Sequence, residues 1–305
     1  MTRTWFITGA NRGLGRAFTE AALGAGDRVV ATARDPRRMP IEHERLIVLP
    51  LDVRDRAAVL SAADTAVERA GHVDIVVNNA GYGLVGAVEE LSEEQLRDQL
   101  EVNFFGALWV SQAFAPHLRA RGSGHIVQIS TVGAAGSLPL FGAYNAGKWA
   151  LEGFSAALAD ELRPFGVHVT LAQLGGFATD WAGSSMRFGT RIPAYDNWRE
   201  QIFGSTDYPA EPASAIPEPA TTPDSAEPAA TSDSAEHAHT APEPVEYADA
   251  APELAARALL DLVAEPNPPL RRIIGPGAHQ MVTAALDQRR ADYARDPEFH
   301  WPTGQ

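Results

Sequence analysis

The stretch of sequence that decides the fold is Thr8-Gly9-Ala10-Asn11-Arg12-Gly13-Leu14-Gly15. It follows an apolar, β-branched run at 5–8 and precedes a helical pattern, so it predicts a turn from a first strand into a first helix. Glycines are needed where a chain turns tightly and where its backbone approaches a pyrophosphate, which then lies on the helix N-terminus. The stretch therefore predicts a dinucleotide site, with a plain structural turn as the alternative.

Beyond this turn, apolar runs alternate with helical patterns along most of the chain, and a long helix is predicted over 143–164. Seven strands are predicted, at 5–8, 28–32, 46–49, 74–77, 125–130, 167–172 and 270–274. Such alternation is typical of repeated βαβ units. We therefore expect an α/β fold, a single Rossmann-type domain with a doubly wound parallel sheet of about seven strands and helices on both faces.

The composition argues against several classes of protein. The 305 residues are 45% hydrophobic, enough for a sizeable core, and the absence of cysteine leaves no disulfide and no thiolate site. A net charge of −14 argues against a nucleic-acid partner. The N-terminus runs at once into a strand pattern, and no run of about eighteen apolar residues follows, so we expect a cytoplasmic protein that is neither exported nor membrane-spanning.

Acidic charge is concentrated in residues 205–250, which contain ten Asp or Glu residues and no Lys or Arg. Subtracting these ten charges from −14 leaves −4 for the rest of the chain. Pro, Ala, Glu, Ser and Thr dominate the segment, which buries too little apolar surface to offset its backbone entropy. It is predicted to be a disordered insert, either a passive tether or an acidic flap, in one domain formed by residues 1–204 and 251–305. Its His237 and His239 are interpreted as part of a polar tract, and no metal site is expected.

The end of the second predicted strand bears on the choice of cofactor. Arg34 at this strand end and Arg12 in the glycine turn offer positive charge to an adenosine 2′-phosphate, so NADP(H) is favoured. Asp35 comes one residue late for a contact with a ribose 2′-hydroxyl and is interpreted as solvated or capping, which keeps NAD(H) possible. After the third strand, Asp52 is placed either near the adenine amino group or at the start of the next helix.

Further motifs follow in a fixed order, namely Asn78-Asn79-Ala80-Gly81 after the fourth strand, then Asn103, then Ser130-Thr131 after the fifth strand, then Tyr144 and Lys148. Small residues after the fourth strand let a cofactor pass over the sheet at its switch point. In this order, the motifs resemble those of the short-chain dehydrogenase/reductase family, in particular its carbonyl and hydroxysteroid-type NADP-dependent oxidoreductases. The resemblance covers nearly all of the chain except the insert.

Lys148 is the only lysine of the chain, and it follows Tyr144 by four positions. On a helix this spacing places both side chains on one face. The resemblance implies that Tyr144 passes a proton to or from the substrate oxygen. It also implies that the ammonium of Lys148 lowers the pKa of the tyrosine and holds the nicotinamide ribose. A surface pair on an amphipathic helix is the alternative.

Two more catalytic residues are implied by the resemblance. A substrate-orienting hydroxyl falls thirteen residues before the tyrosine, where this chain has Thr131 in place of the usual Ser. Ser130 is held in reserve, because adjacent residues of a strand face opposite sides of the sheet. Asn103 matches an Asn that kinks a helix and holds a water in the proton path, and a capping Asn is the alternative.

The resemblance also implies which residues contact the cofactor. They are Gly9, Asn11, Arg12, Gly13, Leu14, Gly15, Arg34, Asp52, Val53, Asn79, Ala80, Gly81, Tyr144, Lys148, Gly175 and Thr179. The chain departs from the family pattern at Leu174, where Pro is usual, and at Gly147, where Ser is common. Neither change removes a reacting group, although both leave the local loop shape and the turnover open.

Substrate specificity in this family comes from the region between the sixth and seventh strands. The residues implied to contact substrate are Thr131, Leu138, Phe141, Phe177 and Trp181. This apolar, aromatic lining suits a hydrophobic ketone, aldehyde or secondary alcohol. The sequence thus favours an NADP(H)-preferring oxidoreductase that interconverts a carbonyl and an alcohol, as a homodimer or homotetramer. A non-catalytic dinucleotide-binding sensor or scaffold protein is the main alternative, and an epimerase or dehydratase resembles the chain less well.

Overall fold

The computed structural model describes residues 2–179, 185–209 and 249–300. Its centre is a seven-stranded sheet in the order β3-β2-β1-β4-β6-β7-β9, and every pairing is parallel. The strands are β1 (Thr4–Ile7), β2 (Arg28–Ala33), β3 (Leu46–Pro50), β4 (Ile75–Asn78), β6 (Gly124–Thr131), β7 (Val167–Leu174) and β9 (Arg271–Ile274). Each of the seven predicted strands overlaps one of them, so the predicted doubly wound α/β fold is confirmed.

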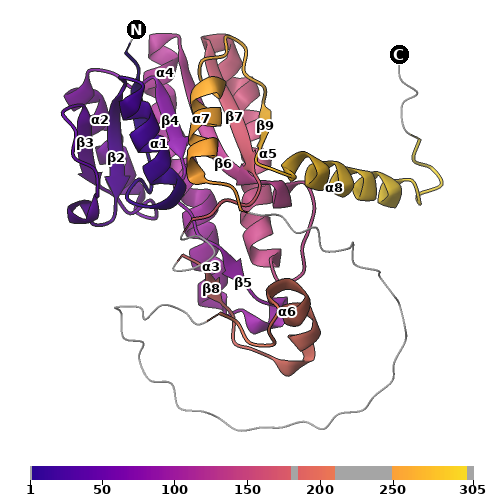
Figure 1. Cartoon of the computed structure of the whole chain (residues 1–305). Coiled ribbons are helices and arrows are strands. Elements are labelled where there is room, and N and C mark those ends of the chain that lie inside the picture. Colours follow the sequence, from indigo (N-terminus) through magenta and orange to yellow (C-terminus); the bar gives the residue numbers. More distant parts are fainter. Residues whose placement is uncertain (1, 180–184, 210–248, 301–305) are drawn as a thin grey trace.

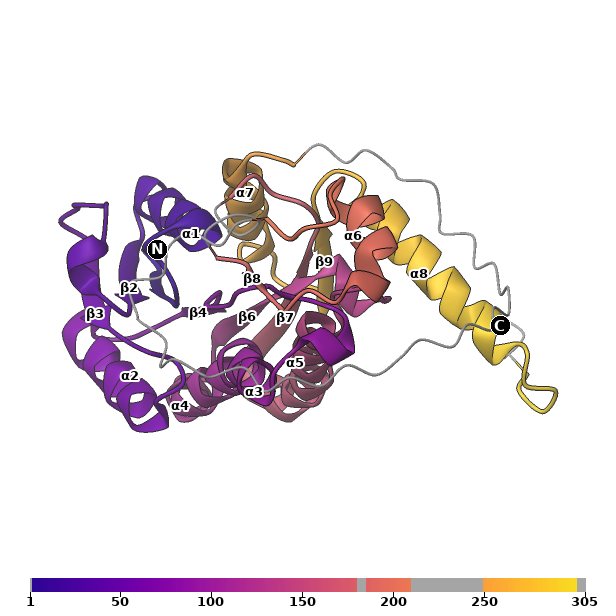
Figure 2. The same cartoon turned by 90° about the horizontal axis from the view of Figure 1, so that it is seen from below.

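Helices cover both faces of this sheet (Figure 1). The longer ones are α1 (Gly13–Gly24), α2 (Arg56–Ala70), α4 (Gly106–Arg121), α5 (Gly142–Leu162) and α7 (Pro252–Leu262), whereas α8 (Ala278–Tyr293) extends away from the sheet (Figures 1 and 2). Shorter ones are α3 (Glu93–Leu100), η3 (Glu101–Phe105), η1 (Pro36–Arg38), η4 (Val132–Ala134) and η5 (Arg163–Phe165). One core lies between the sheet and α1 with α7, and a second lies between the sheet and α2, α4 and α5.

Successive side chains along each strand point alternately into these two cores. In β1, Ile7 joins the core under α1 and α7, whereas its neighbour Phe6 packs against Phe114 of α4 with ring centres 4.6 Å apart. Both faces of the central strands β1 and β4 are buried because both are covered, as in other doubly wound sheets. The strand order reverses between β1 and β4, and ligands of such sheets bind at this switch point, outside the carboxyl ends of the strands.

A small lobe lies beyond the carboxyl edge of the sheet (Figures 1 and 2). We define it as residues 84–90 and 185–209, with β5 (Leu84–Val85) paired to β8 (Arg187–Phe188), and with η2 (Val88–Glu90), η6 (Pro193–Tyr195) and α6 (Asp196–Phe203). Its own apolar cluster includes Met186 and Phe188 and extends to Leu140, just before α5. The two short strands were not predicted, because a two-residue strand carries no recognisable periodicity.

Residues 210–248, most of the predicted insert, lie outside the described residues. The described residues at its two ends contact the body of the protein. Tyr208 stacks on Phe188 of the small lobe, with ring centres 5.1 Å apart. Ala250 forms a parallel bridge with Phe177, and its N–H donates to the carbonyl of Gly176. At 205–209 and 249–250, the two ends of the predicted insert are therefore packed against the body of the protein. Among the residues described, no helix is long and apolar enough to cross a membrane.

Candidate active site

The glycine turn between β1 and α1 has the close backbone contacts that its sequence predicts. Gly9 and Gly13 have φ values of +64° and +51°, which residues with a Cβ rarely adopt. A Cβ on Gly15 would lie 2.2 Å from the carbonyl oxygen of Gly9. The turn therefore packs its own backbone against the start of α1 and leaves the helix N-terminus open to an anion.

The end of β4 braces this turn. The side-chain amide of Asn79 donates to the carbonyls of Thr8 and Gly9, at 2.9 and 3.2 Å. The Thr8 hydroxyl accepts in return from the backbone N–H groups of Asn79 and Ala80, both at 3.0 Å. Asn79 thus ties β4 to β1 at the switch point. Asn78 instead donates to Ser111 of α4.

On the other side of the turn, the loop after β7 approaches. A Cβ on Gly13 would lie 3.5 Å from the Thr179 Cβ, so Thr179 is beside the glycine turn. Gly175 donates its N–H to the carbonyl of Ile274 and holds the loop on β9. Leu174, at the position where Pro is usual, packs into the main core. The loop therefore reaches the predicted cofactor residues without the proline.

At the end of β2, the acidic and basic candidates separate. Asp35 caps η1 by accepting from the N–H of Arg37. Its carboxylate also accepts from two guanidinium nitrogens of that arginine, Nε at 2.9 Å and Nη2 at 3.1 Å. Arg34 is exposed, and its guanidinium donates no hydrogen bond to a described residue. The interpretation of Asp35 as a capping residue is confirmed, and Arg34 remains directed to solvent.

Asp52 does not cap the following helix, since that cap is Asp55, whose carboxylate accepts from the N–H of Ala58. Asp52 is instead held by Arg54 through two guanidinium nitrogens, the shorter contact being 2.6 Å. The hydrogen bond from Arg54 lowers the pKa of Asp52, so its carboxylate is charged at neutral pH. The side chain of Val53 is buried beneath α4, so only its backbone is available to a cofactor.

Tyr144 and Lys148 lie on the first turns of α5, beside the carboxyl end of β6. Both side chains are buried, with 9% and 6% of their surface exposed. The Thr131 hydroxyl, at the end of β6, accepts from the N–H of Gly133 at 3.2 Å and lies near enough to the Tyr144 phenol to lower its pKa. The Lys148 ammonium donates to the carbonyl of Ile129, at 2.7 Å. The predicted i,i+4 pair is therefore not a surface pair.

Burial dominates the pKa values of this pair. It raises the pKa of Tyr144 to about 12, and the hydrogen bond with Thr131 offsets part of the rise. It lowers the pKa of Lys148 to about 8, and the charge of Glu152 acts in the opposite direction. The predicted lowering of the tyrosine pKa by the neighbouring ammonium is wrong for this structure, because desolvation of the phenolate has the larger effect.

Ser130 and Thr131 face different surroundings, as strand alternation predicts. The Ser130 hydroxyl is buried and donates to Glu152, at 2.8 Å. That carboxylate also accepts from Gln173 and Arg271, so Ser130 belongs to a structural network under α5. Only Thr131 is brought to Tyr144, which makes Thr131 the hydroxyl that can contact a substrate.

Asn103 lies inside η3, a π-helical segment between α3 and α4. Its buried amide bonds both backbone groups of Tyr82, accepting from the N–H at 3.0 Å and donating to the carbonyl at 2.8 Å. A π-helical turn widens and bends a helix, often at a functional site. The alternative of a capping Asn is wrong, and the kinked helix agrees with the resemblance. A Cβ on Gly147 would lie at an ordinary 3.6 Å from the Asn103 Cβ, so a serine would also fit there.

Comparison with known proteins agrees with this geometry. A family model described as short chain dehydrogenase matches residues 3–187. The chain belongs to the short-chain dehydrogenase family. Members of this family are NAD(P)-dependent oxidoreductases that act on CH–OH groups, so the site takes a nicotinamide dinucleotide and a small-molecule substrate.

Individual relatives extend the likeness. Oxidoreductase BOA17 of Botryotinia fuckeliana is 44% identical over 200 residues, which are 64% of this chain and 73% of that protein. Human 17-beta-hydroxysteroid dehydrogenase type 1 is 38% identical over 184 residues, 55% of each chain. The crystal structure of a short-chain dehydrogenase from Streptomyces avermitilis superposes with a TM-score of 0.77 and 32% identity, and covers 96% of this chain and 95% of that one.

The residues predicted to contact substrate in this short-chain dehydrogenase do not all gather at the site. Leu138 is 48% exposed, and Phe141 starts α5 and packs against the small lobe. The prediction that Phe177 contacts substrate is wrong, because its ring is buried in the main core against Gly275. Trp181 lies outside the described residues.

The structure also reveals side chains near the site that the sequence did not single out. Leu140 is the one non-glycine residue among those described with a positive φ, +67°, and its carbonyl accepts from the N–H of Gly86. Glu90, Asp98 and Arg199 form ion pairs that join segments far apart in sequence. Within the described part of the chain, no group of three or more acids or histidines could hold a metal ion.

Proposed function

We propose that this protein is an NADP(H)-preferring oxidoreductase that interconverts an apolar ketone or aldehyde and the corresponding alcohol. The observation that carries the proposal is the burial of Tyr144 and Lys148 one helical turn apart on α5, beside the Thr131 hydroxyl at the end of β6. A phenol, a second hydroxyl and an ammonium converge at the carboxyl end of β6, where this fold binds its ligands.

The residues of the glycine turn fit a dinucleotide. Gly9 and Gly15 leave no room for a Cβ because the turn packs against Gly9, Asn79 and Ala80, and this tight turn leads directly into the N-terminus of α1, where a pyrophosphate would lie. Thr179 and Asn79 flank this turn, and Lys148 is the group that would hold the nicotinamide ribose. A bound nicotinamide dinucleotide supplies or accepts the hydride.

The protein's own chemical contribution is the proton. Thr131 donates a hydrogen bond that orients the substrate carbonyl oxygen, and Tyr144 then gives its hydroxyl proton to that oxygen as the alcohol forms. A positioned acid of this kind contributes a rate factor of roughly 10² to 10⁴. Because burial raises the pKa of Tyr144 to about 12, the phenol is protonated at neutral pH. This state favours carbonyl reduction over alcohol oxidation.

Arg34 supports the preference for NADP(H). Its guanidinium is exposed at the end of β2, where the adenosine ribose of a bound dinucleotide is expected. Asp35, the acid that would favour NAD(H), is engaged by Arg37 and by the cap of η1. A free guanidinium and an occupied carboxylate together suit a 2′-phosphate better than a ribose diol.

The surroundings of Tyr144 support an apolar substrate. Leu140 and Phe141, which lie just before α5, pack into the apolar cluster of the small lobe. The similarity to a human hydroxysteroid dehydrogenase, whose name gives a hydroxylated apolar substrate, points the same way. The most direct experiment measures NADPH oxidation by the purified protein with a panel of ketones and aldehydes. Tight NADPH binding without turnover on any of them would favour the sensor alternative.

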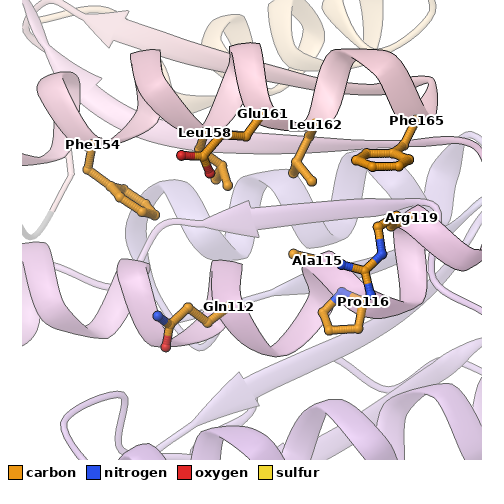
Figure 3. Close-up of a pocket in the computed structure, with 9 residues that line it drawn as sticks. All are labelled: Gln112, Ala115, Pro116, Arg119, Phe154, Leu158, Glu161, Leu162 and Phe165. Carbon is orange, nitrogen blue, oxygen red and sulfur yellow. The ribbon is translucent and has the colours of Figure 1, made fainter.

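A homodimer through α4 and α5 belongs to the same proposal. These helices border a hollow of about 350 Å³ on the face away from the sheet (Figure 3). Phe154, Leu158 and Phe165 from α5 and η5 line it opposite Ala115 and Pro116 of α4, and Phe165 is 45% exposed. Light scattering during size-exclusion chromatography tests the proposal. We expect twice the chain mass, and about the chain mass for Phe165→Asp.

A further inference from the structure

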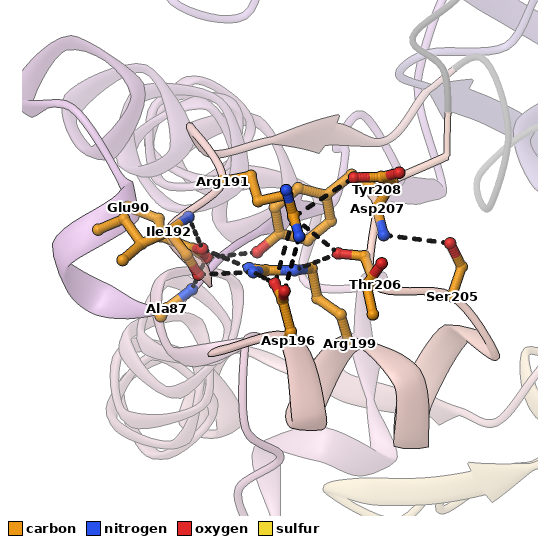
Figure 4. Close-up of polar contacts among 10 residues, drawn as sticks. All are labelled: Ala87, Glu90, Arg191, Ile192, Asp196, Arg199, Ser205, Thr206, Asp207 and Tyr208. Atoms are coloured by element: carbon orange, nitrogen blue, oxygen red, sulfur yellow. Dashed lines mark hydrogen bonds and ion pairs between the residues drawn. The ribbon is translucent and has the colours of Figure 1, made fainter. Parts of the chain in front are cut away.

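The small lobe is held as one unit by a buried ion pair (Figure 4). The side chains of Glu90 and Arg199 are fully buried and paired with each other. Glu90 also accepts from the backbone N–H groups of Ala87 and Ile192, at 2.8 and 2.7 Å, and from the Tyr208 hydroxyl. Removing either partner of such a pair strands a buried charge, so the pair holds η2 and α6 of the lobe together.

One carboxylate connects this lobe to the main domain. Asp98 of α3 accepts through Oδ2 from Arg187 of β8 and from the Tyr82 hydroxyl, both at 2.9 Å. The Arg187 guanidinium lies 4.8 Å from the centre of the Tyr82 ring. Tyr82 is in turn fixed by Asn103 through both of its backbone groups. Asp98 therefore joins the small lobe to the segment that follows the Asn79-Ala80-Gly81 motif.

The other oxygen of Asp98 faces the cofactor side. Its Oδ1 accepts from Arg54, at 2.7 Å, and the same guanidinium grips Asp52 after β3. Burial alone would raise the pKa of Asp98, but hydrogen bonds from Arg54 and Tyr82 outweigh this effect and lower it. The carboxylate is thus charged at neutral pH and shared between two arginines from opposite sides of the site.

We propose that Asp98 is a positioning residue through which cofactor binding beside Asp52 orders the small lobe that covers the substrate side. The inference rests on the proposed function, because it needs a dinucleotide at the carboxyl edge of the sheet. A cofactor contact that fixes the Asp52 side chain restricts the movement of the Arg54 side chain, which in turn restricts Asp98. Arg187, which is paired with Asp98, then also moves less. Binding that rigidifies one site lowers the ordering cost at the next.

Hydrogen exchange of β8 tests this coupling without any substrate. The N–H groups of Arg187 and Gly189 donate to Gly83 and Val85, so their exchange reports opening of the lobe. In the unmodified protein, we expect saturating NADPH to slow this exchange about threefold, the effect of one well-formed carboxylate–guanidinium contact. NADPH affinity is measured in parallel from the cofactor fluorescence.

Three variants separate coupling from simple damage. Asp98→Asn keeps the shape of the side chain, and we expect it to bind NADPH while losing the slowing in β8. Arg187→Gln removes the ion pair with Asp98 and the stacking on Tyr82 but leaves the contact of Arg54 with Asp98, and it should give the same loss, with no further loss in the double variant. Glu93→Gln, on the same helix but in an exposed pair with Arg97, serves as the matched control and should retain the slowing.

The outcomes distinguish the two proposals. NADPH-dependent slowing of β8 that persists in Asp98→Asn overturns the role of Asp98 while leaving the proposed function intact. The role of Asp98 is also overturned, with the proposed function intact, if NADPH slows exchange in the glycine turn but not in β8 of the unmodified protein. Absence of NADPH binding to the unmodified protein removes the proposed function itself, and the inference with it.

Discussion

The ammonium nitrogen of Lys148 lies 2.7 Å from the carbonyl oxygen of Ile129, at the inner edge of the sheet. Only 6% of this lysine is exposed, and burial lowers its pKa to about 8. A charge held there at neutral pH costs folding free energy, because the unfolded chain would hydrate it fully. A buried charge that is kept despite its cost in stability is typical of a functional group.

Replacing Lys148 by Met should therefore stabilise the protein while abolishing carbonyl reduction. The fall in pKa from 10.5 to about 8 corresponds to a penalty of about 3 kcal/mol. Losing the hydrogen bond to Ile129 costs about 1 kcal/mol, which leaves a gain of about 2 kcal/mol in urea unfolding at pH 7. The gain is complete below pH 8, where Lys148 is protonated in both the folded and the unfolded protein. It disappears as pH rises toward 10.5, because the folded parent protein then no longer holds a buried charge. A variant less stable than the parent at pH 7 contradicts this account.

The pH dependence of turnover should follow the same lysine. Since the phenol of Tyr144 has a pKa of about 12, it keeps its proton across the accessible range. Lys148 loses its proton near pH 8, and with it the charge proposed to hold the nicotinamide ribose. We expect kcat/KM for carbonyl reduction to be flat through neutral pH and to fall tenfold per pH unit well above 8. A profile that stays flat to about pH 10 rules out Lys148 as the titrating group.

Thr131 and Ser130 should differ in what they affect. Thr131→Ala removes the hydroxyl bonded to Tyr144 and is expected to lower kcat/KM about 10- to 100-fold, whereas Thr131→Ser restores most of it. Ser130→Ala breaks only the bond to Glu152 and should cost about 1 kcal/mol of unfolding free energy with kcat nearly unchanged. Steady-state kinetics beside urea unfolding separates the two effects. Equal kinetic losses at both positions would mean that the substrate hydroxyl has been misassigned.

Arg34 should set the choice of cofactor. In Arg34→Ala we expect the KM for NADPH to rise about tenfold, the effect of one charge-assisted hydrogen bond, with the KM for NADH unchanged. Arg38→Ala is the matched control, because this residue is also exposed and lies four positions later. An equal rise in both variants would show a general effect of surface charge rather than a contact with the 2′-phosphate.

Sequence patterns located the main sheet because its strands contain apolar, mostly β-branched residues and alternate with helical patterns. They also located Tyr144, Thr131 and Lys148, whose spacing along one helix and one strand end is preserved in the fold. Phe177 was misplaced because an apolar residue in a loop reads the same whether it faces a substrate or a core. Only its packing against Gly275 separates the two.

The ion pairs of the small lobe were beyond reach of the sequence for a different reason. Asp98 meets Arg187, and Glu90 meets Arg199, across 89 and 109 positions of the chain. No local periodicity records contacts between residues so far apart. The lowered pKa predicted for Tyr144 failed similarly, since the extent of burial is set by tertiary packing.

The most direct test of the central claim compares Tyr144→Phe with the unmodified protein, using NADPH and the best carbonyl substrate of the panel. Because the phenol supplies the proton, we expect kcat to fall by a factor of about 10² to 10⁴ while the dissociation constant of NADPH changes less than about threefold. Thermal unfolding of the variant checks that its fold is intact. A folded Tyr144→Phe protein that binds NADPH and keeps its full kcat would contradict the assignment of Tyr144 as the proton donor.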